Sequence, residues 1–162
     1  MYSAEYLYGK GKQTIDKYPK STVCMFKITN LEEINKEICR EAGNKTLVEV
    51  SNIVKSSISS EYVYVRYMGP KFAIAFSGID LDAVVSFMKD IQSKVEAIEV
   101  EPIDVNATEE TTAETEVTEN AKPEINIVLS TYYKGTALEG LTKKLEEYLD
   151  NAPKGEHTIS YL

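Results

Sequence analysis

The sequence contains few residues that bind soft metal ions. Its only cysteines are Cys24 and Cys39, and its only histidine is His157. The cysteines do not form a C-x-x-C pair, and ligands this few and this scattered do not assemble a tetrahedral zinc site. We therefore expect two reduced cysteines, as is usual for a cytoplasmic protein, and neither a metal ion nor another cofactor.

Long apolar runs are also absent from the sequence. No stretch approaches the roughly 18 residues that a membrane-spanning helix requires. The first residues, MYSAEYLYGKGK, lack the basic-then-apolar pattern of a secretory signal. A hydrophobic content of 43 % over 162 residues suits one soluble domain with a substantial core. The sequence predicts a single domain spanning residues 1–162 and located in the cytoplasm.

Basic residues are outnumbered by acidic ones, and the difference is concentrated in one segment. The formal net charge is −8, and residues 104–120 carry six acidic side chains with no lysine or arginine. The rest of the chain is therefore near neutral and has no basic stripe. This distribution argues against nucleic acid as a main partner.

The Thr/Glu-rich stretch 104–122 has too few apolar residues to build a core. We predict that it is a disordered insertion within the domain. A tolerated surface loop is the simplest interpretation, because lengthening a loop costs little free energy. A docking segment for a protein partner and a phosphorylation target on its threonines are the two functional alternatives.

Apolar spacing along the chain predicts an α+β fold. Runs rich in β-branched and aromatic residues indicate strands, and apolar residues three and four positions apart indicate helices. Gly9 and Gly11 interrupt the first helix, and Gly43 with Asn44 marks a joint between the next two helices. The predicted elements are a helix at 3–18, a strand at 22–28, two helices within 31–58, a hairpin at 61–77, a helix at 81–97, a short additional strand at 97–103, a strand at 124–133, a helix at 138–152 and a strand at 157–162. The order β-α-α-β-β-α-β-α-β implies a central, mostly antiparallel five-stranded sheet covered by helices.

Two stretches carry a family resemblance. Residues 27–47 read KITNLEEINKEICREAGNKTL, and residues 66–76 read RYMGPKFAIAF. Without a gap, they resemble the patterns D-I-D-x-F-K-x-I-N-D-x-x-G-H-x-x-G-D-x-x-L and R-Y-G-G-D-E-F-A-I-I-L of the GGDEF domain, the bacterial diguanylate cyclase family. The matching positions are Ile28, Ile34, Asn35, Gly43, Leu47, Arg66, Tyr67, Gly69, Phe72, Ala73 and Ile74. The resemblance extends over the element order of essentially the whole chain and implies a nucleotide-cyclase-like, ferredoxin-like core.

Members of this family condense two GTP molecules into cyclic di-GMP across two facing domains. The chemistry needs carboxylates that hold divalent cations, because these cations neutralise the triphosphate and help to activate the attacking 3′-hydroxyl. The resemblance places Lys27 and Pro70 at the family's metal-binding acids, and Lys71 at the acid that follows. It therefore implies that these three catalytic positions have lost their function and that no metal binds.

The nucleotide-binding positions are only partly retained. Asn35 matches the family's base-contacting asparagine, and Asn44 replaces an aspartate. An amide still hydrogen-bonds to guanine but loses the charge-assisted bond that a carboxylate makes. With Gly69 in the signature turn and the two lysines, the asparagines form the candidate nucleotide-binding set. Each asparagine also has a purely structural interpretation, at a helix turn or a helix boundary.

The closing motif and the product-inhibition motif of the family are both degraded. In NAPKGEH, Ala152 and Glu156 stand where the family has a lysine and an arginine. Ser59 and Tyr62 stand where the product-inhibition motif has an arginine and an aspartate. Glu156 would repel a triphosphate, and neither Ser59 nor Tyr62 can clamp cyclic di-GMP.

Three functional hypotheses follow. The first is a catalytically inactive GGDEF-like domain that acts as a regulatory or interaction module in bacterial cyclic di-GMP-type signalling, with other signalling domains, a protein partner or a second copy as its partner. The second is a metal-independent sensor of GTP or a related nucleotide, in which Lys27 and Lys71 replace the cations. The third is an active enzyme, a cyclase or a phosphatase, with altered metal ligation. A simpler role for the two lysines, pairing with nearby acids such as Glu156, competes with the second hypothesis.

Overall fold

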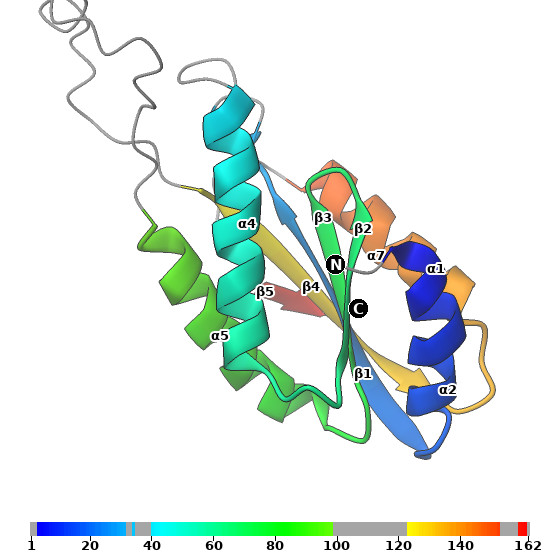
Figure 1. The fold of residues 1–162 in the computed structure, drawn as a ribbon. Coiled ribbons are helices and arrows are strands. Elements are labelled where there is room, and N and C mark those ends of the chain that lie inside the picture. Colours follow the sequence, from blue (N-terminus) through cyan, green and yellow to red (C-terminus); the bar gives the residue numbers. More distant parts are fainter. Residues whose placement is uncertain (1–2, 32–33, 35–39, 99–122, 153–158, 162) are drawn as a thin grey trace, which may run out of the picture.

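The computed structural model describes residues 3–31, 34, 40–98, 123–152 and 159–161, with only the backbone described for residues 40–42. A five-stranded sheet forms its centre, with the strands in the order β2-β3-β1-β4-β5. The strands are β1 (Lys20–Ile28), β2 (Val63–Met68), β3 (Lys71–Phe76), β4 (Ile125–Tyr133) and β5 (Ile159–Tyr161). Every neighbouring pair is antiparallel except β4 and β5. The predicted α+β class and mostly antiparallel sheet are confirmed (Figure 1).

Helices cover both faces of this sheet (Figure 1). The helices α4 (Arg40–Ser57) and α5 (Leu81–Glu96) pack on one face, where alternate residues of β1 such as Phe26 and Ile28 join them in a core. On the other face lie α7 (Leu138–Asn151) and the N-terminal helical segment, made of α1 (Ala4–Tyr6), η1 (Leu7–Gly11) and α2 (Lys12–Ile15). Val23 and Met25 of β1 face this second core. Successive residues of a strand point to opposite faces, so one short strand contributes to both cores.

The predicted joint at Gly43 and Asn44 is wrong. Helix α4, described over Arg40–Ser57, runs through both residues. A glycine inside a helix costs about 1 kcal/mol relative to alanine. Burial of Leu47, Val50 and Val54 against the sheet outweighs that cost.

The N-terminal segment also differs from its prediction. Gly9 and Gly11 do not interrupt it, because the chain stays helical from Ala4 to Ile15 with a π-helical turn at Leu7–Gly11. The helix ends before Tyr18, whose side chain is 43 % exposed. A Cβ added at Gly11 would lie 3.1 Å from Leu7 Cδ1 and 3.5 Å from Val63 Cγ1. The missing side chain therefore lets the segment pack closely on β2.

The remaining predictions around α5 are tested only in part. Ala97 caps the C-terminus of α5, so the strand predicted at 97–103 does not begin there, and residues 99–103 lie outside the described residues. The acidic stretch 104–122 also lies outside them. Strand β5 occupies only 159–161 of the predicted 157–162 among the described residues. Within the described part of the chain, the structure contains no helix long and apolar enough to span a membrane.

Candidate functional site

Lys27 and Lys71 lie side by side at one end of the sheet. They are cross-strand partners in the antiparallel pair of β1 and β3. Phe26 precedes Lys27 in β1, Phe72 follows Lys71 in β3, and both rings face α4 and α5. Because successive residues of a strand point to opposite faces of the sheet, the two lysine side chains point toward α7. Figure 1 shows the end of β1, the β2–β3 turn, the start of α4 and the end of α7 gathered at this end of the sheet.

Two acidic residues of α7 neutralise the lysine pair. Lys71 Nζ donates to Glu146 Oε2 at 2.9 Å and lies 2.8 Å from Asp150 Oδ1. Lys27 Nζ lies 3.6 Å from the same Asp150 oxygen. The network of Lys27, Lys71, Glu146 and Asp150, called here the lysine–carboxylate network, ties α7 to the two strands.

Lys71 is the most buried member of this network, with a side chain 11 % exposed. Burial on its own would lower the pKa of Lys71, but the hydrogen bonds to Asp150 and Glu146 outweigh it, and the net shift of the pKa is upward. The hydrogen bond from Lys71 lowers the pKa of Asp150, against a smaller effect of burial in the opposite direction. Lys71 and Asp150 are therefore both charged at neutral pH, with opposite signs.

The side chains at the positions where the family resemblance places acids do not fit a divalent cation. Lys27 and Lys71 supply ammonium groups. Among the described residues, the carboxylates near them, both on α7, already pair with these groups. A divalent ion about 4 Å from a single ammonium group would be repelled by roughly 8 kcal/mol at an effective dielectric near 20. In the described part of the chain, no three Asp, Glu, His or Cys residues come together as a metal site.

Two backbone carbonyl groups of the turn between β2 and β3 accept hydrogen bonds that hold the turn in place. Gly69 has a φ of +55°, a left-handed conformation that glycine adopts at little cost. The carbonyl of Gly69 accepts from Arg66 Nε at 2.9 Å, and the carbonyl of Pro70 accepts from the Ile28 amide at 3.0 Å. The turn is thereby fixed to the end of β1, beside Lys27.

Among the described residues, the other site residues singled out from the sequence do not join the lysine–carboxylate network. Asn44 is exposed on α4, on the sheet face opposite to α7. Ala152 is half-buried at the end of α7, and Tyr62 packs against Phe76 with ring centroids 5.2 Å apart. Ser59 is exposed in the loop before β2. The predicted positions Asn35 and Glu156 lie outside the described residues.

Comparison with known families identifies this architecture. The family model described as "Diguanylate cyclase, GGDEF domain" matches residues 5–156. The chain belongs to the GGDEF family. No curated protein sequence matches this GGDEF domain.

Solved structures with this fold share little sequence with the GGDEF domain described here. Diguanylate cyclase SiaD from Pseudomonas aeruginosa, in complex with its activator SiaC, gives a TM-score of 0.81 at 12 % identity, over 99 % of this chain and 58 % of SiaD. The GGDEF domain of DgcB from Caulobacter crescentus, in complex with c-di-GMP, gives 0.79 at 10 % identity, over 98 % and 90 % of the two chains. The FimX GGDEF domain from Pseudomonas aeruginosa gives 0.77 at 13 % identity, over 100 % and 94 %. At these identities the likeness shows the fold alone.

Sequence reasoning missed Glu146 and Asp150, the acids that pair with the lysines. It expected such pairing and suggested Glu156 as a partner. Glu146 and Asp150 stand four positions apart within the helix predicted at 138–152, and residues at this spacing share a helical face. That spacing was the available signal, but only the packing of α7 on the sheet shows that this face meets β1 and β3.

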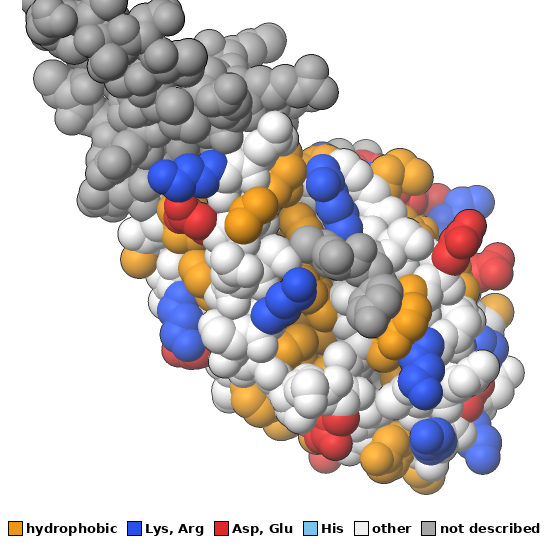
Figure 2. Space-filling view, viewed as in Figure 1, with side chains coloured by type: hydrophobic (Ala, Val, Ile, Leu, Met, Phe, Trp, Pro, Cys, Tyr) orange, Lys and Arg blue, Asp and Glu red, His pale blue; other side chains and the backbone are white. Residues whose placement is uncertain are grey.

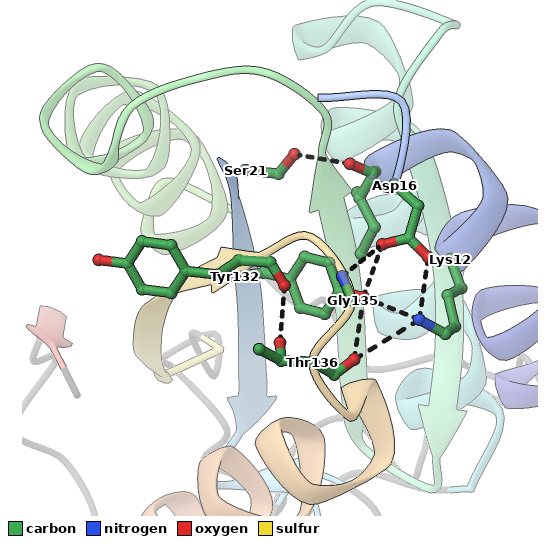
Figure 3. Close-up of polar contacts among 8 residues, drawn as sticks. Lys12, Asp16, Ser21, Tyr132, Gly135 and Thr136 are labelled. Atoms are coloured by element: carbon green, nitrogen blue, oxygen red, sulfur yellow. Dashed lines mark hydrogen bonds and ion pairs between the residues drawn. The ribbon is translucent and has the colours of Figure 1, made fainter. Parts of the chain in front are cut away.

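A second polar network holds the N-terminal segment of the GGDEF domain in place. Lys12 Nζ donates to Asp16 Oδ2 and to the Tyr132 hydroxyl, each at 2.9 Å. The Tyr132 hydroxyl in turn donates to Asp16 Oδ1 at 2.8 Å, with the Thr136 carbonyl 3.1 Å away. Figure 3 shows the side chains of Lys12, Asp16 and Tyr132 converging beside the β4–α7 turn. Hydrogen bonds from Lys12 and Tyr132 lower the pKa of Asp16, with the bond from Lys12 contributing most.

Proposed function

We propose that this GGDEF domain does not cyclise GTP and that it acts as a regulatory or interaction module in bacterial cyclic di-GMP-type signalling. In this proposal the chain is one cytoplasmic domain, with residues 104–122 as an insertion. Its partners are other signalling domains, a protein, or a second copy of the chain.

The observation that carries the proposal is the environment of Lys71. Its ammonium group lies at a position where the family resemblance places an acid, and two carboxylates of α7 are within 2.9 Å of it. Lys27, at the position of a metal-binding acid, shares one of these carboxylates. Two cations and two anions stabilise each other here, so neither of these two carboxylates is left to hold the cation that GTP condensation needs.

A cyclase assay tests this proposal directly. The purified chain is incubated with GTP and either Mg²⁺ or Mn²⁺, and the products are separated by chromatography, with an active GGDEF domain as the positive control. We expect GTP to be recovered without formation of cyclic di-GMP. Turnover with either cation would refute the inactive assignment.

The side-by-side placement of Lys27 and Lys71 favours one alternative function. Two adjacent ammonium groups match a phosphate group, so a metal-independent GTP sensor is the second candidate. Such binding would require the lysines to leave Glu146 and Asp150. Calorimetry with GTP in excess chelator distinguishes the two candidates. The sensor predicts binding that is lost in Lys27→Glu and Lys71→Glu, and the interaction module predicts no heat.

The assembly state tests the remaining part of the proposal. SiaD, a diguanylate cyclase of the same fold, forms a complex with its activator protein, and the family acts through facing domain pairs. Sedimentation velocity over a range of concentrations measures whether this chain self-associates. A dimer would make a second copy the partner, and a monomer at all concentrations would leave a different protein in that role.

A further inference from the structure

An open groove on the surface of the domain lies away from the lysine–carboxylate network. It has a volume of about 920 Å³ and is bounded by the N-terminal helical segment, the end of α4 and the loop leading into β2. Strand β2 is an edge strand of the sheet, and Val63 and Tyr64 of this strand line the groove. None of the four residues of the lysine–carboxylate network belongs to this lining.

One wall of the groove is a single face of the N-terminal segment. The residues that line the groove from this face follow one another at helical spacing, and they are Tyr6, Lys10, Thr14 and Lys17. The opposite face of the segment is fixed to the domain. There, the Tyr8 hydroxyl hydrogen-bonds with the hydroxyls of Tyr67 and Thr142 at 3.0 and 2.7 Å, and Lys12 contacts Tyr132 (Figure 3). The wall is therefore held in position before any partner arrives.

Positive charge predominates in the groove, although the whole chain has a net charge of −8. Lys10, Lys17 and Lys55 line it, and Glu61 supplies the one carboxylate among the described lining residues. In the described part of the structure none of these three lysines forms an ion pair. Cations without partners, gathered in a concave site, attract and orient an anionic partner.

The positions of the lysines favour a partner whose negative charges are spread along a chain. Lys10 and Lys17 stand seven positions apart on the helical segment and the turn that ends it, which is about 10 Å at a rise of about 1.5 Å per residue. Lys55 belongs to α4, on the other side of the groove. An extended peptide advances about 3.3 Å per residue, so carboxylates about three residues apart match this separation.

Aromatic and apolar side chains complete the groove. They are Tyr6, Tyr18, Ile58, Tyr62 and the buried Val63. The Tyr62 ring is held against Phe76, with the ring centroids 5.2 Å apart. Figure 2 shows apolar side chains between lysine or arginine side chains across the face between α4 and the N-terminal segment. Such a surface suits a peptide in which apolar side chains stand between acidic ones.

Two other anionic partners fit this groove less well. A membrane surface is flat, whereas the groove is concave and has a wall on each side. Nucleic acid carries a negative charge at every nucleotide, so a chain of net charge −8 would repel the parts of it that extend beyond the groove. A short acidic segment of a protein avoids both difficulties.

We propose that this groove is the docking site for an acidic peptide segment of a partner protein, in which carboxylates about three residues apart flank apolar side chains. The carboxylates pair with Lys10, Lys17 and Lys55, and the apolar side chains pack on Tyr62 and Val63. This inference rests on the proposed role of the domain as an interaction module, and it names the chemistry of the partner.

Fluorescence anisotropy of the full chain with a labelled peptide of sequence EELEELEE tests the proposal. We expect a dissociation constant of about 100 µM or lower at low ionic strength, and weaker binding as salt is added, because salt screens the lysines. The peptide QQLQQLQQ removes the charges and EESEESEE removes the leucines. Each should bind at least about tenfold more weakly than EELEELEE. In ¹⁵N-edited NMR spectra, the amide shifts should fall on residues 10–18 and 55–64.

Charge variants localise the site. The double variant Lys10→Glu/Lys55→Glu reverses one charge on each side of the groove and should weaken binding of EELEELEE at least about tenfold. Lys89→Glu/Lys144→Glu is the matched control, because both lysines are exposed, lie outside the groove and form no ion pair among the described residues. It changes the net charge equally and should alter the affinity by less than about twofold.

Several results would overturn the proposal. These are no binding of EELEELEE at millimolar concentration, equal affinity for QQLQQLQQ, equal weakening by the two double variants, or amide shifts confined to Lys27 and Lys71. Tighter binding of a peptide with the sequence of residues 107–120, ATEETTAETEVTEN, would make the chain's own acidic segment the occupant and would overturn the assignment to a partner protein.

Two features keep this test independent of other outcomes. The peptide comparisons use the unaltered chain, and circular dichroism establishes whether each double variant keeps the fold. The cyclase assay does not involve the groove, so a chain that neither cyclises GTP nor binds EELEELEE would refute this inference and leave the inactive assignment in place.

Discussion

Lys71 combines a nearly buried position with two carboxylate partners on a different element. Its side chain is 11 % exposed, compared with 23 % for Lys27, and its contacts with Glu146 and Asp150 are shorter than the contact of Lys27. Breaking a partly buried ion pair leaves the remaining charges without partners, whereas an exposed pair contributes little. The two lysines should therefore differ in their effect on stability.

Replacing Lys71 should destabilise the domain more than replacing Lys27. We expect Lys71→Met to lower the free energy of unfolding by about 2 kcal/mol and Lys27→Met to lower it by less than about 1 kcal/mol. Urea denaturation measures both. Lys94→Met, which removes an exposed pair with Asp90, serves as the control and should cost about 0.3–0.5 kcal/mol. A Lys27 effect equal to that of Lys71 would contradict the assigned geometry.

The lowered pKa of Asp150 makes the stability of the network depend on pH. In the folded protein this pKa lies below its ordinary value of 3.8 because of Lys71. Ionised Asp150 therefore contributes stability above pH 3.8, and this contribution is lost as the pH falls through the lowered value. We expect the difference in unfolding free energy between wild type and Asp150→Asn to be constant near neutral pH and to shrink in acid.

Urea titrations at several pH values measure this difference. Glu147→Gln provides the control, because Glu147 is exposed on the same helix and forms no ion pair among the described residues. A difference for Asp150→Asn that does not change between neutral and acidic pH would show that Asp150 is not ionised against Lys71. The raised pKa of Lys71 has the opposite consequence, so its contribution is present below pH 10.5 and is lost in stronger alkali.

At the scale of elements, the N-terminal segment is helical although it contains two glycines. The π-helical turn at Leu7–Gly11 includes both Gly9 and Gly11, which occupy different environments. A Cβ at Gly9 would meet nothing within 4 Å, while a Cβ at Gly11 would meet Leu7 and Val63. Glycine in a helix is entropically unfavourable compared with alanine. Close packing explains why glycine is present at position 11, and nothing in the structure explains it at position 9.

Alanine substitutions at Gly9 and Gly11 should change the stability of the domain in different directions. We expect Gly9→Ala to raise the free energy of unfolding by about 0.5–1 kcal/mol, because it restricts the unfolded chain without a clash. Gly11→Ala should give no gain or a loss, because Leu7 and Val63 must move to make room. Thermal unfolding of the two variants checks the order, and a larger gain at Gly11 would show that the segment is not packed on β2.

At the scale of the whole molecule, most of the net negative charge of the sequence belongs to one segment. Residues 104–122 hold six acidic residues and one lysine, a net −5 of the chain's −8, and the sequence predicts this segment to be an insertion without a core of its own. Replacing 104–122 with a Gly/Ser sequence of equal length should shift the melting temperature by no more than about 2 °C. Differential scanning calorimetry measures the change. A loss of about 10 °C or more would show that the segment contributes to the packed structure.

Most helices and strands could be predicted from the sequence, but the partners of individual side chains could not. The strands that became β1 to β5 and the helix at 81–97 were recognised because apolar spacing repeats within a few residues, whereas the strand predicted at 97–103 was not found at Ala97. The joint predicted at Gly43 was wrong because packing of Leu47, Val50 and Val54 outweighed the local preference of glycine. The acids facing Lys71 were missed because Glu146 lies 75 positions away.

The sequence alone determined the order of strands and helices, and it placed lysines at positions where the resembling family carries acids. Those properties are set by residue type and by spacing along a short stretch of chain. Only the tertiary structure decided that α7 neutralises Lys27 and Lys71 and that Lys12 meets Tyr132 across 120 positions. Side-chain contacts of this kind depend on how distant elements pack, and local spacing does not encode that.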